Sequence, residues 1–297
     1  MIYEMSICVN QSSMTNKQKQ QCLSVLRWYR ENRRNLPWRN TRNPYRILVS
    51  EMMLQQTQVE RVIPIYKEFF HRFPTIHALS DAKPKDVIVA WKGLGYNRRA
   101  VYLNKTAKMI VQNFNGKIPR TLAELKTLSG IGDYTARAIL SFAFLEPVAV
   151  LDTNHRQFYQ ELFFKEKKKD LELLEKAEEV VQWLVHEHEP PSGSPLRGGR
   201  SKLVYDWNQA VMDYVSCNMK HVPYNMVEKT NVIPFQESDR YFRGRIVDDL
   251  REEKSVQLIV CRKRFGEIDD VRFEMIVRGL ERDGLIKRTG KRILLPA

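Results

Sequence analysis

The amino-acid sequence predicts an all-α protein that ends in a small C-terminal α+β domain. Two patterns carry this prediction. Between residues 20 and 219, segments with apolar residues at helical spacing follow one another, separated by short breaks that contain glycine or proline. From residue 236 onward, three further helical segments precede a basic stretch that is typical of a small β-hairpin turning at Thr289 and Gly290.

The composition restricts the function classes. A chain of 297 residues is long enough for a main domain and a smaller one. Lysine and arginine together number 49 against 35 aspartates and glutamates, which gives a net charge of +14. Such an excess favours a polyanionic partner, and nucleic acid is the first candidate; the alternative is a merely basic surface.

Membrane and secreted classes are not expected. No stretch approaches the roughly 20 consecutive apolar residues that span a bilayer. The first 20 residues lack the apolar core of a secretion signal, so we expect a cytoplasmic protein. Cys8, Cys22, Cys217 and Cys261 lie far apart, with no CxxC pair. We therefore expect reduced thiols, with neither a metal site nor an iron–sulfur cluster.

The helical segments can be placed in order along the chain. A mobile segment is expected at 1–20, a main domain at 21–230 with a flexible loop at 189–202, and the smaller domain at 236–297. One helix carries Glu51 and another begins near His155. The other expected helices cover residues 20–33, 59–73, 86–91, 100–114, 121–127, 134–144, 162–188, 205–213, 241–251, 256–264 and 271–282.

The central motif is residues 128–136, in which Gly130 and Gly132 interrupt two helical segments. Glycine permits positive φ and close approach of another backbone, and the amides that open the next helix can hold a phosphate. This pattern is a helix-hairpin-helix signature, although an ordinary tight turn would use the same glycines. Asp133 would repel a phosphate there, unless it caps the helix and Arg137 restores the attraction.

Two carboxylates are candidates for chemistry. Glu51 shares a helix face with apolar Ile47, Leu48 and Leu54, and burial would raise its pKa, as a general acid requires. The alternative is a Glu51 side chain turned aside to form a salt bridge with Arg46 or Arg61. Asp152 ends an apolar run just before a helix, where it can act as an N-cap and stay ionised.

These motifs together resemble a known family. "LVSEMMLQQTQV", "GLGY", "GIGDYTARAILSFAF" and "VLDTN" occur in the order found in the helix-hairpin-helix DNA glycosylase superfamily, and most closely in its adenine-specific MutY branch. The resemblance covers about residues 36–219. It implies a two-subdomain glycosylase fold, with a monomer acting on double-stranded DNA that carries a mismatch or lesion.

The resemblance implies roles for particular residues. Glu51 would protonate the flipped adenine, and Asp152, supported by Asn154, would stabilise the cationic sugar. Tyr134 stands where bifunctional members keep a Schiff-base lysine, so base removal without strand cleavage is implied. The implied DNA contacts are Trp38, Arg39, Leu54, Gln56, Thr57, Tyr96, Arg98, Gly130, Gly132, Thr135 and Arg137. Trp38 and Arg39 fit a packed loop equally well, Leu54 fits a core position, and the loop at Tyr96 fits a glycine-capped turn.

Three departures qualify the resemblance. Asn97 replaces a second tyrosine, and Cys217 is the only cysteine where most relatives hold an iron–sulfur cluster, so no cofactor is expected beyond a monovalent cation at hairpin carbonyls. The C-terminal domain resembles a winged helix rather than the nudix-like domain that recognises 8-oxoguanine. It is expected either to contact phosphate through the hairpin residues Lys287, Arg288, Lys291 and Arg292 or only to pack against the catalytic domain.

The resulting expectation is a monofunctional glycosylase of base excision repair that removes adenine opposite guanine or 8-oxoguanine. One alternative is a thymine or uracil mismatch glycosylase on the same fold, since Tyr134 and Asp152 suit that chemistry too. Glu51 favours adenine, because an acid that protonates a purine has less obvious use on thymine. The other alternative is a DNA-binding regulator without catalysis.

Overall fold

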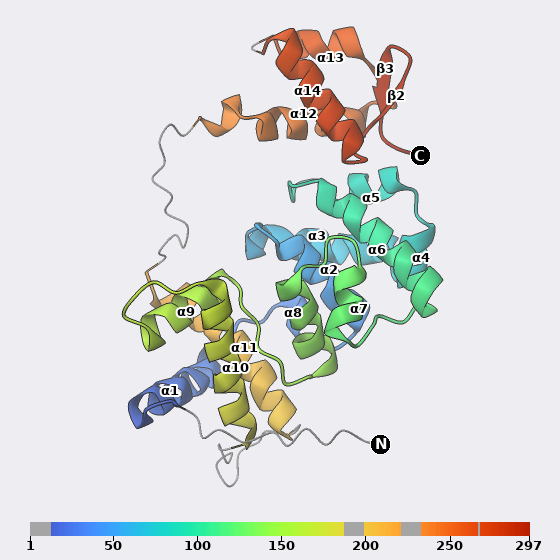
Figure 1. Ribbon diagram of the computed structural model, residues 1–297. Helices are drawn as coiled ribbons and strands as arrows, with labels where there is room; N and C mark the ends of the chain where they lie inside the picture. The colour runs from blue at the N-terminus through green and yellow to red at the C-terminus, as the bar shows by residue number, and fades with distance from the viewer. Residues whose placement is uncertain (1–12, 187–198, 221–232, 267) are drawn as a thin grey trace, which may run out of the picture. The chain divides into compact units, whose positions relative to one another are not determined.

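The computed structural model describes residues 13–186, 199–220, 233–266 and 268–297. The chain divides into two compact units, whose helices and strands are labelled in Figure 1. Unit 1 comprises Met1–Asn35 and Leu140–Met226, and unit 2 comprises Leu36–Ile139 and Val227–Ala297. Among the described residues, no helix combines the length and apolarity that a membrane crossing requires.

Unit 1 is built from α1 (Asn16–Asn32), α9 (Thr153–Phe163), α10 (Asp170–His186) and α11 (Gly199–Asn218), with the last turns of α8 (Asp133–Phe144). These helices enclose an apolar core in which Tyr159 and Trp207 are fully buried. The Trp207 indole donates a hydrogen bond to the Tyr159 hydroxyl at 3.0 Å, so both polar atoms are satisfied inside the core.

Helix α1 begins at Asn16, earlier than the sequence pattern predicts. Thr15 forms a capping box: its side chain accepts from the Gln18 backbone amide, and the Gln18 side chain accepts from the Thr15 amide at 2.9 Å. Part of the expected mobile segment is therefore helical, while residues 1–12 lie outside the described part of the chain.

The single helix expected at 162–188 is wrong, because α9 ends at Phe163 and α10 starts at Asp170. Phe164 is extended, and the break contains a run of like-charged lysines that favours a loop. The Gln160 side chain donates to the Glu166 carbonyl and accepts from the Lys168 amide, both at 2.8 Å, which satisfies the loop backbone. Of the expected flexible loop, residues 199–202 are helical in α11, and the rest lies outside the described residues.

The first part of unit 2 holds a bundle of helices. Its elements are the 3₁₀ turn η1 (Pro37–Arg39), α2 (Pro44–Leu54), α3 (Val59–Arg72), α4 (Ile76–Asp81), α5 (Pro84–Ala90), α6 (Arg98–Phe114), α7 (Leu122–Thr127) and most of α8. Helix α2 starts sharply because the Asn43 side chain accepts from the Tyr45 and Arg46 amides, and Pro44 occupies the first helical position. Its inner face packs into a core around Phe69, Trp91 and Leu103.

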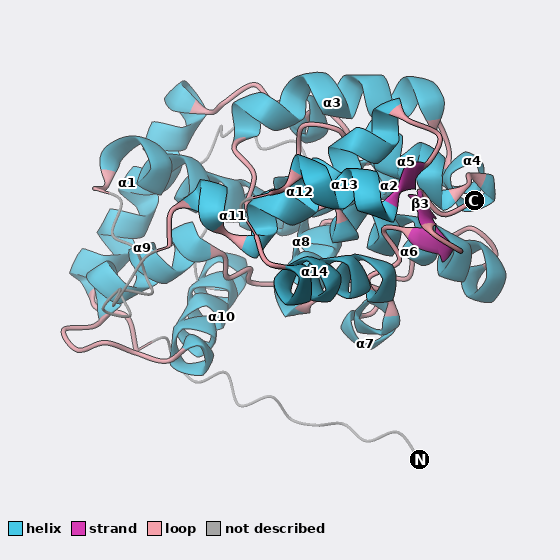
Figure 2. Cartoon of the chain, turned by 90° about the horizontal axis from the view of Figure 1, so that it is seen from above, coloured by secondary structure: helices cyan, strands magenta, loops and turns pink. Residues whose placement is uncertain are grey.

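The second part of unit 2 has the winged-helix arrangement that the sequence predicts. It runs from η2 (Phe235–Glu237) through α12 (Asp239–Glu252), β1 (Val256–Gln257), α13 (Leu258–Arg264) and α14 (Asp270–Arg282) to β2 (Lys287–Thr289) and β3 (Arg292–Leu294). The strands, magenta in Figure 2, form an antiparallel sheet of order β1-β3-β2, with Val256 opposite Ile293. The expected helix at 256–264 is therefore shorter, because Val256 and Gln257 pair with β3 instead.

Specific hydrogen bonds join the two parts of unit 2. The Arg251 guanidinium of α12 donates to the Ile88 carbonyl at the end of α5 and to the Asn97 side chain, each at 2.9 Å. The Lys85 amide donates to the Pro296 carbonyl at 3.0 Å. Because Arg251 satisfies buried carbonyl groups, it positions α12 next to the loop that precedes α6.

Candidate active site

The hairpin at residues 128–132 connects α7 and α8, as predicted, but its two glycines have different functions. Gly130 has φ +77°, and a Cβ atom there would lie 2.9 Å from the Tyr102 side chain. Only glycine fits this position. Gly132 has no positive φ, and a Cβ atom would find nothing within 4 Å, so the chain itself does not require this glycine.

Asp133 opens α8 and is neutralised by two cations. Its carboxylate accepts from Lys126 at 3.1 Å and from Arg137 at 2.8 Å. Burial raises the Asp133 pKa, but hydrogen bonds from Lys126 and Arg137 outweigh it and hold the pKa below its ordinary value. The aspartate therefore stays charged at neutral pH. It forms an ion pair with Arg137, a residue that the resemblance assigns to DNA binding.

Glu51 and Tyr134 come together although they lie 83 positions apart. Glu51 is buried in α2, at 5% exposure, beside the fully buried Met52 and Met53. The Tyr134 hydroxyl, from the first turn of α8, donates to Glu51 Oε2 at 3.0 Å. Arg46, one of the alternative partners of Glu51, lies over the Phe70 ring. The hydrogen bond from Tyr134 fixes the orientation of this carboxyl group.

Asp152 is the N-cap of α9, as predicted, and both of its oxygens have donors. Oδ1 accepts from the His155 backbone amide at 2.8 Å and lies 2.6 Å from His155 Nδ1. Oδ2 accepts from the Asn154 side chain at 3.1 Å. Burial raises the Asp152 pKa, but the His155 ring and these hydrogen bonds outweigh it, so that the pKa lies below its ordinary value. The site therefore holds an ionised carboxylate.

His155 is a site residue that the sequence analysis missed. Its ring is fully buried and stacks on Tyr159, and its Nε2 atom has no hydrogen-bond partner among the described residues. The signal in the sequence is the spacing: an N-cap and its third following residue are neighbours.

Arg99 is buried, and it organises the loops that the resemblance assigns to DNA. Its buried guanidinium donates to the carbonyls of Met52 and Met53 at 2.9 and 2.8 Å, to Thr57 Oγ1 at 3.0 Å and to the Leu94 carbonyl at 3.2 Å. Burial lowers its pKa to about 10, so it remains charged at neutral pH. Arg99 thereby joins the end of α2 to the loop before α6.

The loop residues predicted to contact DNA surround this arginine. Gln56 is exposed and Tyr96 half-buried, and both adopt left-handed backbone conformations, with φ +53° and +44°. Thr57 is partly buried, and its hydroxyl donates a hydrogen bond to the Leu94 carbonyl. Arg98 is exposed but lies 3.5 Å from Asp283. Gln56 and Tyr96 thus have strained backbones held by neighbouring structure, as is common at functional sites.

Other residues predicted to contact DNA are buried or half-buried. Trp38 is buried and packs edge-on against Tyr66, as the packed-loop alternative describes, and Arg39 is half-buried. Thr135 is buried, and its hydroxyl accepts a hydrogen bond from Nε2 of the Gln55 side chain at 3.2 Å. Leu54 is half-buried at the end of α2.

The catalytic candidates are divided between the two units. Glu51 and Tyr134 belong to unit 2, and Asp152 and Asn154 belong to unit 1. In the described ranges, no group of three or more histidine, cysteine, aspartate or glutamate side chains is arranged to hold a metal ion.

Part of the chain is similar to known proteins. Residues 49–182 match the model of the HhH-GPD superfamily of base excision DNA repair proteins. An adenine DNA glycosylase of Buchnera aphidicola is 48% identical over 132 residues, which cover 44% of this chain and 38% of the relative. One from Mycolicibacterium smegmatis is 46% identical over 136 residues, covering 46% of each. The chain thus matches less than half the length of these curated relatives.

The fold also has relatives among solved structures. A thermostable thymine-DNA glycosylase is 26% identical, with a TM-score of 0.56 over 68% of this chain and 87% of that one. Residues 49–182, the segment that matches the superfamily model, contain Glu51, Tyr134, the glycine-tipped hairpin and Asp152. Residues 49–182 are thus similar to the HhH-GPD superfamily of base excision DNA repair proteins, and in particular to its adenine DNA glycosylases.

Proposed function

We propose that the protein is a monofunctional DNA glycosylase that removes adenine mispaired with guanine or 8-oxoguanine from double-stranded DNA. The observation that carries the proposal is the buried Glu51 carboxyl group with its Tyr134 hydrogen bond, inside a segment similar to adenine DNA glycosylases. Because burial penalises the charged form, a buried carboxyl group can keep its proton near neutral pH, as a general acid requires.

The proposed reaction begins with an adenine that has been flipped out of the duplex. Glu51 donates its proton to N7 of the base, and the electrons of the glycosidic bond move onto the departing adenine. The Tyr134 hydroxyl then stabilises the carboxylate that remains on Glu51.

The sugar is left with cationic, oxocarbenium-like character. Asp152, held ionised by His155 and Asn154, stabilises this cation. Water adds to the sugar and loses a proton, which leaves an abasic site. Tyr134 has no amine to form an imine with that site, so no strand cleavage by that route is expected.

The second candidate function is that of a thymine or uracil mismatch glycosylase. It is supported by a thymine-DNA glycosylase of similar fold, which is 26% identical to this chain. The adenine assignment is favoured by the 48% and 46% identities to adenine glycosylases and by the buried acid. We further propose that the protein acts as a monomer in the cytoplasm, on the nucleoid, without an iron–sulfur cluster.

A panel of duplexes with A·G, A·8-oxoguanine, T·G and U·G pairs tests the proposal. Base release is scored as abasic sites cleaved by alkali. We expect adenine release from the first two duplexes alone. Release of thymine or uracil instead would support the alternative, and no abasic product from any pair would refute a glycosylase activity.

A further inference from the structure

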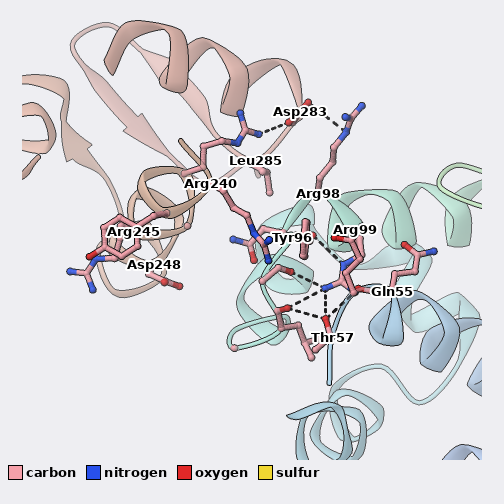
Figure 3. A pocket seen from close by; sticks show the side chains of 18 of the residues that line it. Gln55, Thr57, Tyr96, Arg98, Arg99, Arg240, Arg245, Asp248, Asp283 and Leu285 are labelled. Atoms are coloured by element: carbon pink, nitrogen blue, oxygen red, sulfur yellow. Dashed lines mark hydrogen bonds and ion pairs between the residues drawn. The ribbon is translucent and has the colours of Figure 1, made fainter. Parts of the chain in front are cut away.

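A cavity of about 1070 Å³ lies within unit 2, between the loops that the resemblance assigns to DNA and helix α12 (Figure 3). One wall consists of the turn after α2, from Gln55 to Gln58, and the loop that leads into α6. The facing wall comes from α12 and the end of α14. Its volume matches the upper end of typical ligand sites, roughly 300 to 1,000 Å³, so it can hold a nucleotide with its flanking phosphates.

The cavity is strongly basic. Its lining contains seven arginines and two aspartates. Asp283 is shared by Arg98 and Arg243, and Asp248 pairs with Arg251. Both carboxylates therefore already have cationic partners.

Arg61, Arg240 and Arg245 remain without a carboxylate among the residues that the structure describes, and all three line the cavity. Uncompensated guanidinium groups in a concave site attract an anion, and they suit phosphate through bidentate hydrogen bonds. The charge distribution therefore favours a phosphate-containing ligand.

One of these arginines also forms a stacking surface. The Arg240 guanidinium lies 3.7 Å from the centroid of the Tyr96 ring, and Figure 3 shows its side chain extending from α12 toward Tyr96. Tyr96 is held at φ +44° in a loop that Arg99 fixes through carbonyl hydrogen bonds. A planar guanidinium and an aromatic ring are the groups on which unpaired bases stack. The cavity thus combines a stacking surface with phosphate ligands.

We propose that this cavity binds one strand of the DNA substrate, with Arg61 and Arg245 on its phosphates and a base on the Arg240–Tyr96 pair. DNA is the ligand class because guanidinium groups beside a stacking surface suit a nucleic acid strand, and because residues 49–182 match the model of a superfamily of DNA repair proteins. The inference rests on the proposed function. It gives the winged-helix domain a role in substrate binding through α12.

The basic hairpin, which the sequence indicated for this role, is a weaker candidate. Arg288 lies 2.9 Å from Glu274, and Arg292 donates to Ser255 Oγ at 2.8 Å. Neither lines the cavity. Helix α12 therefore provides Arg240 and Arg245 for the proposed strand, and α3 provides Arg61.

The experiment measures binding to a short duplex that carries a tetrahydrofuran abasic analogue, which the enzyme cannot process. The dissociation constant is determined between about 50 and 200 mM KCl for the full chain and for Arg245→Ala and Arg240→Ala. Each substitution is expected to weaken binding several-fold. Loss of a phosphate contact at Arg245 reduces the salt slope by about 0.9.

Two further variants separate the possible causes. Arg240→Lys keeps the charge but loses the planar stacking group, so weaker binding with an unchanged salt slope is expected. Arg278→Ala, at an exposed α14 position outside the cavity, is the matched control and should bind like the unmodified chain. Thermal melting of each variant verifies that it is folded.

Folded Arg240→Ala and Arg245→Ala variants that bind with unchanged affinity and salt slope would overturn the inference, even if adenine is released. Weakened binding by these variants supports it, even if the unmodified protein releases no base from any mismatch. The latter outcome would refute only the proposed function.

Discussion

The Nδ1 atom of His155 lies 2.6 Å from Oδ1 of Asp152, and the ring is fully buried. This contact predicts that His155→Leu slows adenine release under single-turnover conditions by about tenfold to a hundredfold, because a hydrogen bond to a charged group contributes roughly 1.5–3 kcal/mol. His155→Asn keeps a donor near the Nδ1 position and should recover part of the rate. Equal rates for the leucine and asparagine variants would contradict the role of the donor.

The pH profile provides an independent readout of the same contact. His155 is among the groups that lower the Asp152 pKa, so its removal raises that pKa. The carboxylate is needed in its ionised form, and the acid limb of the single-turnover rate should move to higher pH in His155→Leu. If the limb stays where it is in the unmodified enzyme, Asp152 is not the group that titrates there.

The two hairpin glycines should respond differently to alanine. Gly130→Ala is expected to lower the melting temperature, because left-handed backbone costs an L-residue roughly 1–2 kcal/mol and the new Cβ would lie 2.9 Å from Tyr102. Gly132→Ala meets no protein atom within 4 Å and should melt like the unmodified chain. If the hairpin approaches phosphate closely at this point, Gly132→Ala weakens duplex binding. Unchanged binding would place the DNA elsewhere.

Arg99 should contribute mainly to stability. Arg99→Met leaves the buried carbonyls of Met52 and Met53 without this donor, and each unsatisfied group costs about 1–3 kcal/mol. Urea unfolding should therefore show a loss of several kcal/mol. The neighbouring Arg98→Met, at an exposed position, should change the free energy of unfolding by about 0.5 kcal/mol or less. Similar losses for both variants would contradict the assignment.

Asp133 should limit DNA affinity. Because its carboxylate accepts from Lys126 and Arg137, Asp133→Asn removes a negative charge and releases two cations beside the proposed phosphate site. Tighter duplex binding with a steeper salt slope is expected in a salt titration. Unchanged affinity would show that this aspartate exerts no repulsion on DNA.

Local patterns predicted much of the fold. The all-α architecture, the Asp152 N-cap and the C-terminal hairpin follow from helical periodicity, capping chemistry and turn residues, and the structure confirms them. The Thr15 capping box was also readable, as a T-x-x-Q spacing, but was missed. The break between α9 and α10 at residues 164–169 could not be predicted from local patterns, because hydrogen bonds from the Gln160 side chain help to determine it.

Less of the candidate site could be predicted from the spacing of residues in the sequence. The contact between Glu51 and Tyr134 joins positions 83 residues apart, so only the family resemblance placed both in one site. The Arg240–Tyr96 contact joins the two parts of unit 2, 144 positions apart in the sequence, and no local pattern encodes it. Burial of Thr135 likewise depends on how α2 packs against α8, which periodicity does not specify.

The most direct test of the account is the release of free adenine from an A·8-oxoguanine duplex by the unmodified protein and by Glu51→Gln, quantified by chromatography. The account predicts stoichiometric release in a single turnover by the unmodified protein. The variant should release none while retaining its affinity for the duplex. Undiminished adenine release by Glu51→Gln would contradict the account.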